Sequence, residues 1–147
     1  MKRKDTVGFE VRTLDNLLFR QMIAFAARRG IDELTVMHGW ILGFLCDNPD
    51  RDIFQKDIEV EFSIGRSTVT GILQLMEKKG FICRQSVPHD RRLKKLVLTE
   101  KGRTIHTETL LDIDYMEDHI RTGISDEDME TFFRVIRKIR ENMEKMK

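Results

Sequence analysis

The most informative stretch of the sequence is residues 54–102, FQKDIEVEFSIGRSTVTGILQLMEKKGFICRQSVPHDRRLKKLVLTEKG. A short helical pattern begins at Phe54 and ends before Ser63–Gly65, whose residues are typical of a tight turn. A second helical pattern starts at Arg66 and ends at Gly80. Two short apolar or mixed runs follow, separated by a polar segment, which is the pattern of a hairpin. The stretch therefore predicts two short helices across a tight turn, then a hairpin with a cationic tip.

The second predicted helix has one apolar face and one polar face. Apolar residues recur at i, i+3, i+4 and i+7 and make a buried stripe of Val69, Ile72, Leu73 and Met76. The opposite face carries short or polar residues, namely Ser67, Thr70, Gly71, Gln74 and Lys78. Arg66 opens the helix, where a cation and the free backbone amides attract phosphate. An apolar back and a polar front suit a helix that enters the major groove of DNA. The alternative is an ordinary amphipathic surface helix, and the hairpin that follows favours the DNA interpretation.

The predicted hairpin pairs residues 81–84 with residues 93–98 and has a charged tip. Asp90 and Arg92 stand at i and i+2, with Arg91 between them. An aspartate beside an arginine on a tight loop can hold the guanidinium in one orientation by a charge-assisted hydrogen bond. An arginine presented in this way suits a narrow minor groove, where the potential is most negative. The alternative for this segment is a solvated charged loop.

Together these elements predict a mainly α fold with a small β-hairpin, a winged helix-turn-helix. Their order and spacing resemble the MarR family of bacterial transcriptional regulators, and most of the family's signature stands in residues 67–102. The resemblance implies a dimeric repressor whose partners are a double-stranded DNA operator and a small-molecule effector. It also implies that Asp90 orients Arg92, because these two positions match an aspartate–arginine pair at the wing tip of the family.

Nine residues of the two helices and the wing are the candidates for DNA contacts: Gln55, Arg66, Ser67, Thr68, Thr70, Gln74, Arg91, Arg92 and Lys94. Four positions depart from the family pattern. Gly71 replaces a long polar or basic residue, so either the helix backbone approaches DNA closely or a specificity contact is missing. Phe54 stands where a capping Ser or Thr is common and Glu59 where a small residue is common, so the first helix of the pair is expected to be set differently. His38 stands where glutamine is frequent.

Charge is distributed unevenly along the chain, although the net charge is only +1. Residues 63–103 hold ten Lys or Arg against three Asp or Glu, a net +7. Residues 108–130 hold nine Asp or Glu against Arg121 alone, a net −8. Clustered positive charge, rather than net charge, gives salt-dependent binding to phosphate. The sequence therefore places a cationic patch on the winged segment and an anionic surface elsewhere.

Two helices are predicted before this segment. The first runs from about Leu14 to Arg29 and is ended by Gly30. The second is capped by Thr35, ends before Pro49 and has an apolar stripe of Met37, Trp40, Ile41, Phe44 and Leu45.

Two further helices are predicted after the hairpin. Thr99 begins a long helix whose inward side chains are Ile105, Ile113, Met116 and Ile120. Ser125 and Asp128 form a capping pair for a last helix, on which Met129, Phe132, Phe133, Ile136 and Met143 are aligned. This last stripe is too wide and too aromatic to be left in solvent and needs a partner surface.

The family resemblance supplies that surface as a homodimer in which N- and C-terminal helices interlock. The interface is then expected to hold Leu14, Phe132, Phe133, Ile136 and Met143. Residues 1–147 form one domain in this interpretation, with residues 35–103 as the DNA-binding lobe and residues 8–30 and 104–147 as dimerisation helices. The operator should be an inverted repeat, because a two-fold dimer doubles the contact. The alternative is that the apolar face of the last helix folds back on its own core.

Other classes of protein are not supported. No run of eighteen apolar residues predicts a membrane span, and the basic first five residues lack the apolar segment of a secretory signal, so a cytoplasmic protein is expected. Cys46 and Cys83 are expected to be small buried hydrophobes, and Cys46 has no evident basic neighbour. No catalytic, metal or cofactor motif occurs, so neither an enzyme nor a cofactor is expected. The competing function is a winged-helix protein-interaction module that does not bind DNA.

Overall fold

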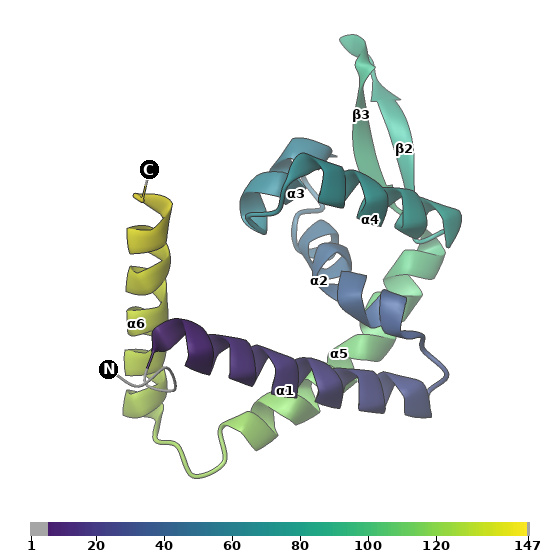
Figure 1. Ribbon diagram of the computed structural model, residues 1–147. Coiled ribbons are helices and arrows are strands. Elements are labelled where there is room, and N and C mark those ends of the chain that lie inside the picture. Colours follow the sequence, from purple (N-terminus) through teal and green to yellow (C-terminus); the bar gives the residue numbers. More distant parts are fainter. Residues whose placement is uncertain (1–5, 147) are drawn as a thin grey trace. The chain divides into compact units, whose positions relative to one another are not determined.

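The computed structural model describes residues 6–146, except for the side chains of residues 33–35 and 37. Its elements, in chain order, are α1 (Val7–Arg28), α2 (Glu33–Asp47), β1 (Ile53–Phe54), α3 (Gln55–Glu61), α4 (Arg66–Lys78), β2 (Ile82–Val87), β3 (Asp90–Leu98), α5 (Glu100–Ile120) and α6 (Asp126–Glu144) (Figure 1). The chain divides into two compact units, residues 1–112 and residues 113–147. The mainly helical fold and the helix-turn-helix of α3 and α4 confirm the fold predicted from the sequence.

The sheet is antiparallel with strand order β1-β3-β2, so it has one strand more than the predicted hairpin. The added strand pairs Ile53 with Leu96, and the buried Ile53 side chain joins the core. The hairpin is also longer than predicted. A bulge follows Ser86, after which Val87 pairs with Asp90, so the turn is only Pro88 and His89. Residues 90–92, predicted to lie in a loop, therefore belong to β3. Figure 1 shows the hairpin projecting from the helices of its unit.

The core of the first unit lies under α4. Val69, Leu73 and Met76 are fully buried, as the periodicity predicted, and Ile72 packs against them half-buried. Side chains from the other elements complete this cluster: Ile41, Leu42, Leu45, Ile53, Ile58, Phe81, Ile82, Leu96 and Leu98. α4 is thus docked by one face only, which leaves its opposite face in solvent.

Both N-terminal helices begin earlier than predicted. α1 starts at Val7 because Thr6 caps it, its Oγ1 accepting a hydrogen bond from the Phe9 amide at 3.3 Å. Gly30 ends α1 at a positive φ of 72°, as predicted. α2 starts at Glu33, and the Val36 amide donates to the Asp32 carbonyl. Thr35 therefore lies inside the helix and is not its N-cap; its side chain, like that of Met37, is outside the described part of the structure.

The buried stripe of α2 runs through His38, Ile41, Leu42 and Leu45. These positions are spaced i, i+3, i+4 and i+7, and Trp40 lies beside them rather than among them. Trp40 is 63% exposed, so its predicted place in the apolar stripe was wrong. The polar His38 thus occupies a buried position of α2, whereas the aromatic Trp40 was expected to be buried.

The two C-terminal helices begin where the sequence placed them. Thr99 caps α5, accepting from the Gly102 amide at 3.1 Å, and Ser125 caps α6, accepting from the Asp128 amide at 3.1 Å. Along α5, Ile105 packs against the core of the first unit and Met116 is buried. Ile120 is 36% exposed at the last position of α5, so the prediction that it faces inward was wrong.

Candidate nucleic-acid interface

α4 presents a polar, solvent-facing surface. Arg66 and Ser67 in its first turn, with Thr68, Gly71 and Gln74, are exposed, and a Cβ built on Gly71 meets no atom within 4 Å. Gly65 precedes the helix and provides no capping side chain. The first backbone amides of α4 therefore lack a side-chain cap, which leaves them suited to an anion such as phosphate.

Gln55 links α3 to α4. Its Nε2 donates to the Glu59 Oε1 at 3.0 Å on the same helix and to the Thr70 Oγ1 at 2.8 Å on α4. The Thr70 hydroxyl in turn donates to the Arg66 carbonyl at 2.9 Å. Thr70 was predicted to contact DNA, but its hydroxyl hydrogen is already used within α4. Sequence reasoning had not foreseen this chain of bonds, although Gln55 and Glu59 stand at i and i+4, a spacing that brings side chains together.

The start of α3 is stabilised without a capping residue. Phe54 occupies the N-cap position and has no side-chain acceptor, but its amide donates to the Asp57 Oδ2 at 2.8 Å. An acidic side chain near a helix N-terminus also interacts favourably with the helix dipole. Asp57 thus supplies a side-chain bond at this helix start, and Gln55 is held as the first residue of α3.

The wing carries exposed cations. Arg91, Arg92 and Lys94 are exposed on β3, and Asp90 is half-buried. The Asp90 Oδ1 accepts a hydrogen bond from the backbone amide of Arg92 at 2.8 Å. It was predicted to hold the Arg92 guanidinium, and no ion pair joins these two residues in the described part of the chain. The Asp90 carboxylate fixes the backbone of Arg92 instead, because an aspartate side chain readily reaches the amide two residues further along the chain.

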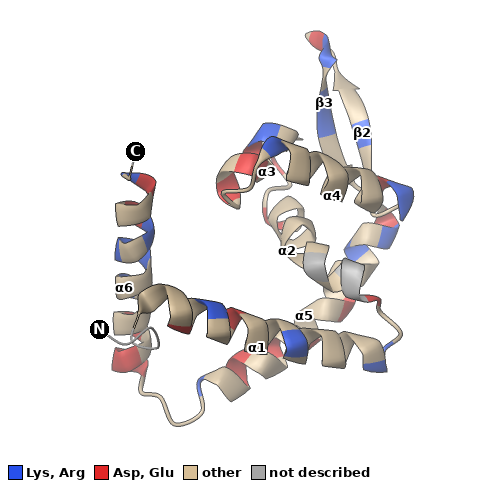
Figure 2. Cartoon of the chain, in the orientation of Figure 1, with Lys and Arg blue, Asp and Glu red and all other residues tan. Residues whose placement is uncertain are grey.

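Positive charge gathers on the hairpin and at the ends of α4 (Figure 2). Two of the wing lysines have partners, since Lys94 donates to the Ser86 Oγ and Lys95 pairs with Asp52 at 2.8 Å. Arg66, Arg91 and Arg92 form no ion pair with any described residue. Three exposed guanidinium groups therefore remain available for an anionic partner.

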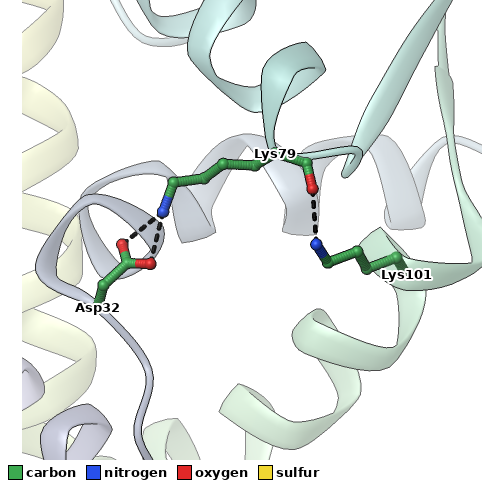
Figure 3. Close-up of polar contacts among 3 residues, drawn as sticks. All are labelled: Asp32, Lys79 and Lys101. Atoms are coloured by element: carbon green, nitrogen blue, oxygen red, sulfur yellow. Dashed lines mark hydrogen bonds and ion pairs between the residues drawn. The ribbon is translucent and has the colours of Figure 1, made fainter.

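The C-terminal end of α4 is tied to two other elements (Figure 3). The Lys79 ammonium binds the Asp32 carboxylate between α1 and α2, with contacts of 2.6 Å to Oδ1 and 2.5 Å to Oδ2. The Lys101 Nζ donates to the Lys79 carbonyl at 2.8 Å from the first turn of α5. Gly80 follows at a φ of 75° and turns the chain into β2. The position of α4 is thus fixed by charged contacts as well as by its apolar face.

Two titratable groups lie near this framework. Burial lowers the pKa of His38 below its ordinary value, the Lys79 charge lowers it further and Asp32 opposes both effects. Burial likewise raises the pKa of the Cys46 thiol, Arg103 opposes that shift and Asp47 adds to it. Arg103 is a basic neighbour of Cys46 that the sequence had not indicated, but burial has the larger effect and the pKa of the thiol is raised.

The five residues predicted for a dimer interface lie on two helices. Leu14 is 46% exposed on α1. On α6, Phe132, Phe133 and Met143 are exposed and Ile136 is half-buried. The rings of Phe132 and Phe133 meet edge to face, with centroids 5.6 Å apart. α6 therefore presents a large apolar surface that its own unit does not cover.

No helix of the described residues is both long and apolar enough to cross a lipid bilayer. The described His, Cys, Asp and Glu side chains form no group of three that could ligate a metal ion.

Comparison with known proteins identifies this arrangement. The family model described as the MarR family matches residues 32–93, which run from the start of α2 into the wing. This winged lobe matches the MarR family of transcription regulators. The resemblance seen in the sequence is confirmed, and α4 with the β2–β3 hairpin is the recognition helix and wing of this fold.

Solved MarR-family structures match almost the whole chain. The transcription regulator MarR from Oenococcus oeni PSU-1 is 26% identical with a TM-score of 0.74, covering 92% of this chain and 99% of that one. The heme sensor PefR from Streptococcus agalactiae, solved with heme, is 28% identical with a TM-score of 0.67, covering 95% of each chain. MepR of S. aureus, solved with DNA, has a TM-score of 0.84 and covers 97% of this chain and 99% of that one; its 20% identity shows the fold alone.

Proposed function

We propose that this chain is a homodimeric repressor that binds a specific double-stranded DNA operator in the cytoplasm and is released by a small ligand. The observation that carries the proposal is a set of three guanidinium groups that form no ion pair with any described residue, at the two places where a winged helix meets DNA. Arg66 lies at the start of α4, and Arg91 and Arg92 lie on the wing. Lys79 and Lys95 on the same lobe are instead paired with Asp32 and Asp52.

The proposed contacts divide by chemistry. Ser67, Thr68 and Gln74 are exposed on α4 and would read base edges in the major groove, with the methyl group of Thr70 beside them. Arg66 would bind phosphate at the start of the helix. Arg91, Arg92 and Lys94 would track the backbone or enter the minor groove, with Asp90 holding the turn that presents them.

The dimer is proposed from the apolar surface of α6. Its exposed phenylalanines, Phe132 and Phe133, are too large to be left in water without a partner. Leu14 on α1, with Ile136 and Met143 on α6, would complete the interface. Residues 35–103 would then form the DNA-binding lobe, and residues 8–30 and 104–147 the dimerisation helices. A two-fold dimer would read inverted half-sites about one helical turn of DNA apart.

A small ligand is proposed as the signal that releases the operator. The heme sensor PefR, which is 28% identical to this chain, was solved with heme, so a protein of the same fold binds a small ligand. A ligand that binds more tightly to one spacing of the two lobes shifts the dimer away from the spacing that spans both half-sites. Repression follows if the free protein has the operator-binding spacing. A ligand that lowers operator affinity in a thermal-shift and gel-shift screen would support this part of the proposal.

The experiment that tests DNA binding is a salt titration with random-sequence duplex DNA. Binding should weaken steeply as salt rises, and Arg92→Ala should flatten the slope of log K against log[salt] by about one unit. Asp90→Ala should give a smaller loss, because it releases the backbone at Arg92 without removing charge. Arg12→Ala removes an exposed arginine from α1, outside the winged lobe, and serves as the control. If Arg92→Ala binds DNA as tightly as the parent at every salt concentration, the wing does not contact DNA. That result would favour a protein-interaction module.

A further inference from the structure

Gln55 is held in one orientation by two neighbours that can only accept hydrogen bonds. An amide side chain has two N–H donors on nitrogen and an oxygen that accepts. Both donors of Gln55 are used, one on the Glu59 Oε1 at 3.0 Å and one on the Thr70 Oγ1 at 2.8 Å, with a longer contact of 3.4 Å to the Arg66 carbonyl. An ionised carboxylate has no hydrogen to give, so Glu59 must face the nitrogen of Gln55 and not its oxygen.

Thr70 favours the same orientation. A hydroxyl has one hydrogen, and that of Thr70 is donated to the Arg66 carbonyl at 2.9 Å. Towards Gln55 the Thr70 oxygen is therefore left only as an acceptor. A flipped Gln55 amide would place its oxygen against two acceptors and lose both bonds, so the two neighbours reinforce each other.

The oxygen of Gln55 is left free. The Gln55 Oε1 accepts no hydrogen bond from any described residue, and the side chain is half-buried beside the first turn of α4. A phosphate group also offers only acceptors, so this oxygen cannot bind the DNA backbone directly. The donors that a duplex exposes in its major groove are the amino groups of adenine and cytosine.

We propose that Gln55 is a specificity-determining residue that acts through its oxygen alone and selects adenine N6 or cytosine N4. An unrestrained glutamine prefers adenine, because its nitrogen can also donate to adenine N7. With both donors committed, Gln55 gains nothing from N7, so cytosine becomes as good as adenine. Guanine and thymine present acceptors at the edge that Gln55 reads, and both are rejected. Glu59 and Thr70 are the positioning residues. The inference rests on the proposed DNA binding.

The test starts with selection of tight binders from a duplex pool of random sequence by the full-length protein. The parent should select operators in which one position of each half-site is adenine or cytosine. Guanine or thymine at that position should weaken binding about tenfold, the cost of a wrong base edge. Glu59→Gln keeps the shape of the side chain but can also donate, so only the rotatable Thr70 hydroxyl still opposes a flip of Gln55. The same substitutions should then cost less than about threefold.

Two further variants separate this mechanism from other effects. Glu61→Gln makes the same charge change on an exposed side chain of the same helix and should leave the preference intact. The exchange Gln55→Glu with Glu59→Gln restores an acceptor at position 55 that residue 59 can hold once the Thr70 hydroxyl turns away from the Arg66 carbonyl, and the adenine or cytosine preference should return. Circular dichroism and thermal melting establish that each variant is folded.

The outcomes distinguish the inference from the function on which it rests. A parent that binds duplex DNA but shows no position limited to adenine or cytosine overturns the role of Gln55 and leaves DNA binding intact. Equal relaxation by Glu59→Gln and Glu61→Gln, or no rescue by the exchange, also overturns it. No binding to the duplex pool at all overturns the proposed function, and the inference falls with it.

Discussion

Gly71→Ala should stabilise the protein, although Gly71 lies in the middle of the helix proposed to read DNA. Glycine inside a helix costs free energy because its backbone loses more conformational freedom on folding than that of alanine. Such a cost persists in a folded protein when a side chain would clash or when function requires its absence. At Gly71 an added Cβ would meet no atom within 4 Å, so a clash inside the protein is excluded for the described residues.

The size of the stabilisation follows from the open space around the added Cβ. Nothing opposes the helix propensity of alanine, so the full difference of about 1 kcal/mol should appear in the free energy of unfolding. For a chain of this length that is a rise in Tm of about 3 °C. The added methyl group buries no apolar surface, so no further gain is expected.

Gly102→Ala is the matched contrast, since Gly102 is also a helical glycine. Its Cβ would lie 2.2 Å from the Phe81 carbonyl oxygen and 3.0 Å from the Leu98 Cδ1. Backbone has to move to relieve that contact, so this variant should lose about 1–3 kcal/mol. Urea unfolding of the parent and the two variants measures both changes. A Gly71→Ala variant that is no more stable than the parent would refute the account of its environment.

The same variant separates the two explanations for glycine on the DNA-facing side of α4. If the backbone of α4 lies against base edges, Gly71→Ala will be more stable and yet bind the selected operator more weakly. If a side-chain contact is simply missing at this position, affinity will stay at the value of the parent. Stability and affinity move in opposite directions only in the first case, so folding defects cannot imitate it.

Three further outcomes are expected. Replacing Phe132 and Ile136 together by Glu should give monomers or unfolded chain in light scattering, because charge would enter the proposed interface; a soluble dimer would exclude α6 from it. His38→Gln should remove a loss of stability in acid. The pKa of His38 is lowered in the folded protein from 6.5, so the unfolded chain takes up the proton first and the free energy of unfolding falls as pH drops below about 6.5; denaturation at pH values above and below that point measures it, with the exposed His89→Gln as control. Gln74→Ala should relax operator preference at one base pair by about 1–3 kcal/mol without changing stability, and unchanged preference would place Gln74 away from the bases.

The local elements of the winged lobe were predictable because each depends on neighbours close in sequence. The stripe of Val69, Leu73 and Met76 follows from helical periodicity, and Ser125 and Thr99 cap their helices through bonds that span three residues. Gly30 and Gly80 adopt the positive φ that ends a helix. Such signals require no knowledge of the tertiary structure.

The errors arose where distant segments decide the outcome. Ile53 and Phe54 are too few to show a strand pattern, and they pair only because β3 lies beside them. Trp40 is exposed because the buried stripe of α2 passes through His38, whose imidazole would normally be placed on the polar side. The hairpin was predicted too short because Pro88 and Asp90 are typical turn residues in a polar segment, whereas pairing with β2 extends β3 through residues 90–92.

Polar contacts hold both ends of α4, and they come from different parts of the lobe. At the first turn, Gln55 joins Thr70 to α3, which sets the donors and acceptors that face DNA. At the last turn, Lys79 is bound by Asp32 from the α1–α2 connection and by Lys101 from α5 (Figure 3). α1 and most of α5 belong to the segments proposed to form the dimer. A ligand that changes the arrangement of those helices would therefore displace the C-terminal end of α4 through the contacts of Lys79. The N-terminal end of α4 would still hold Gln55 in the same orientation. We therefore expect the ligand to change the half-site spacing that the dimer accepts. The base preference within each half-site should stay the same.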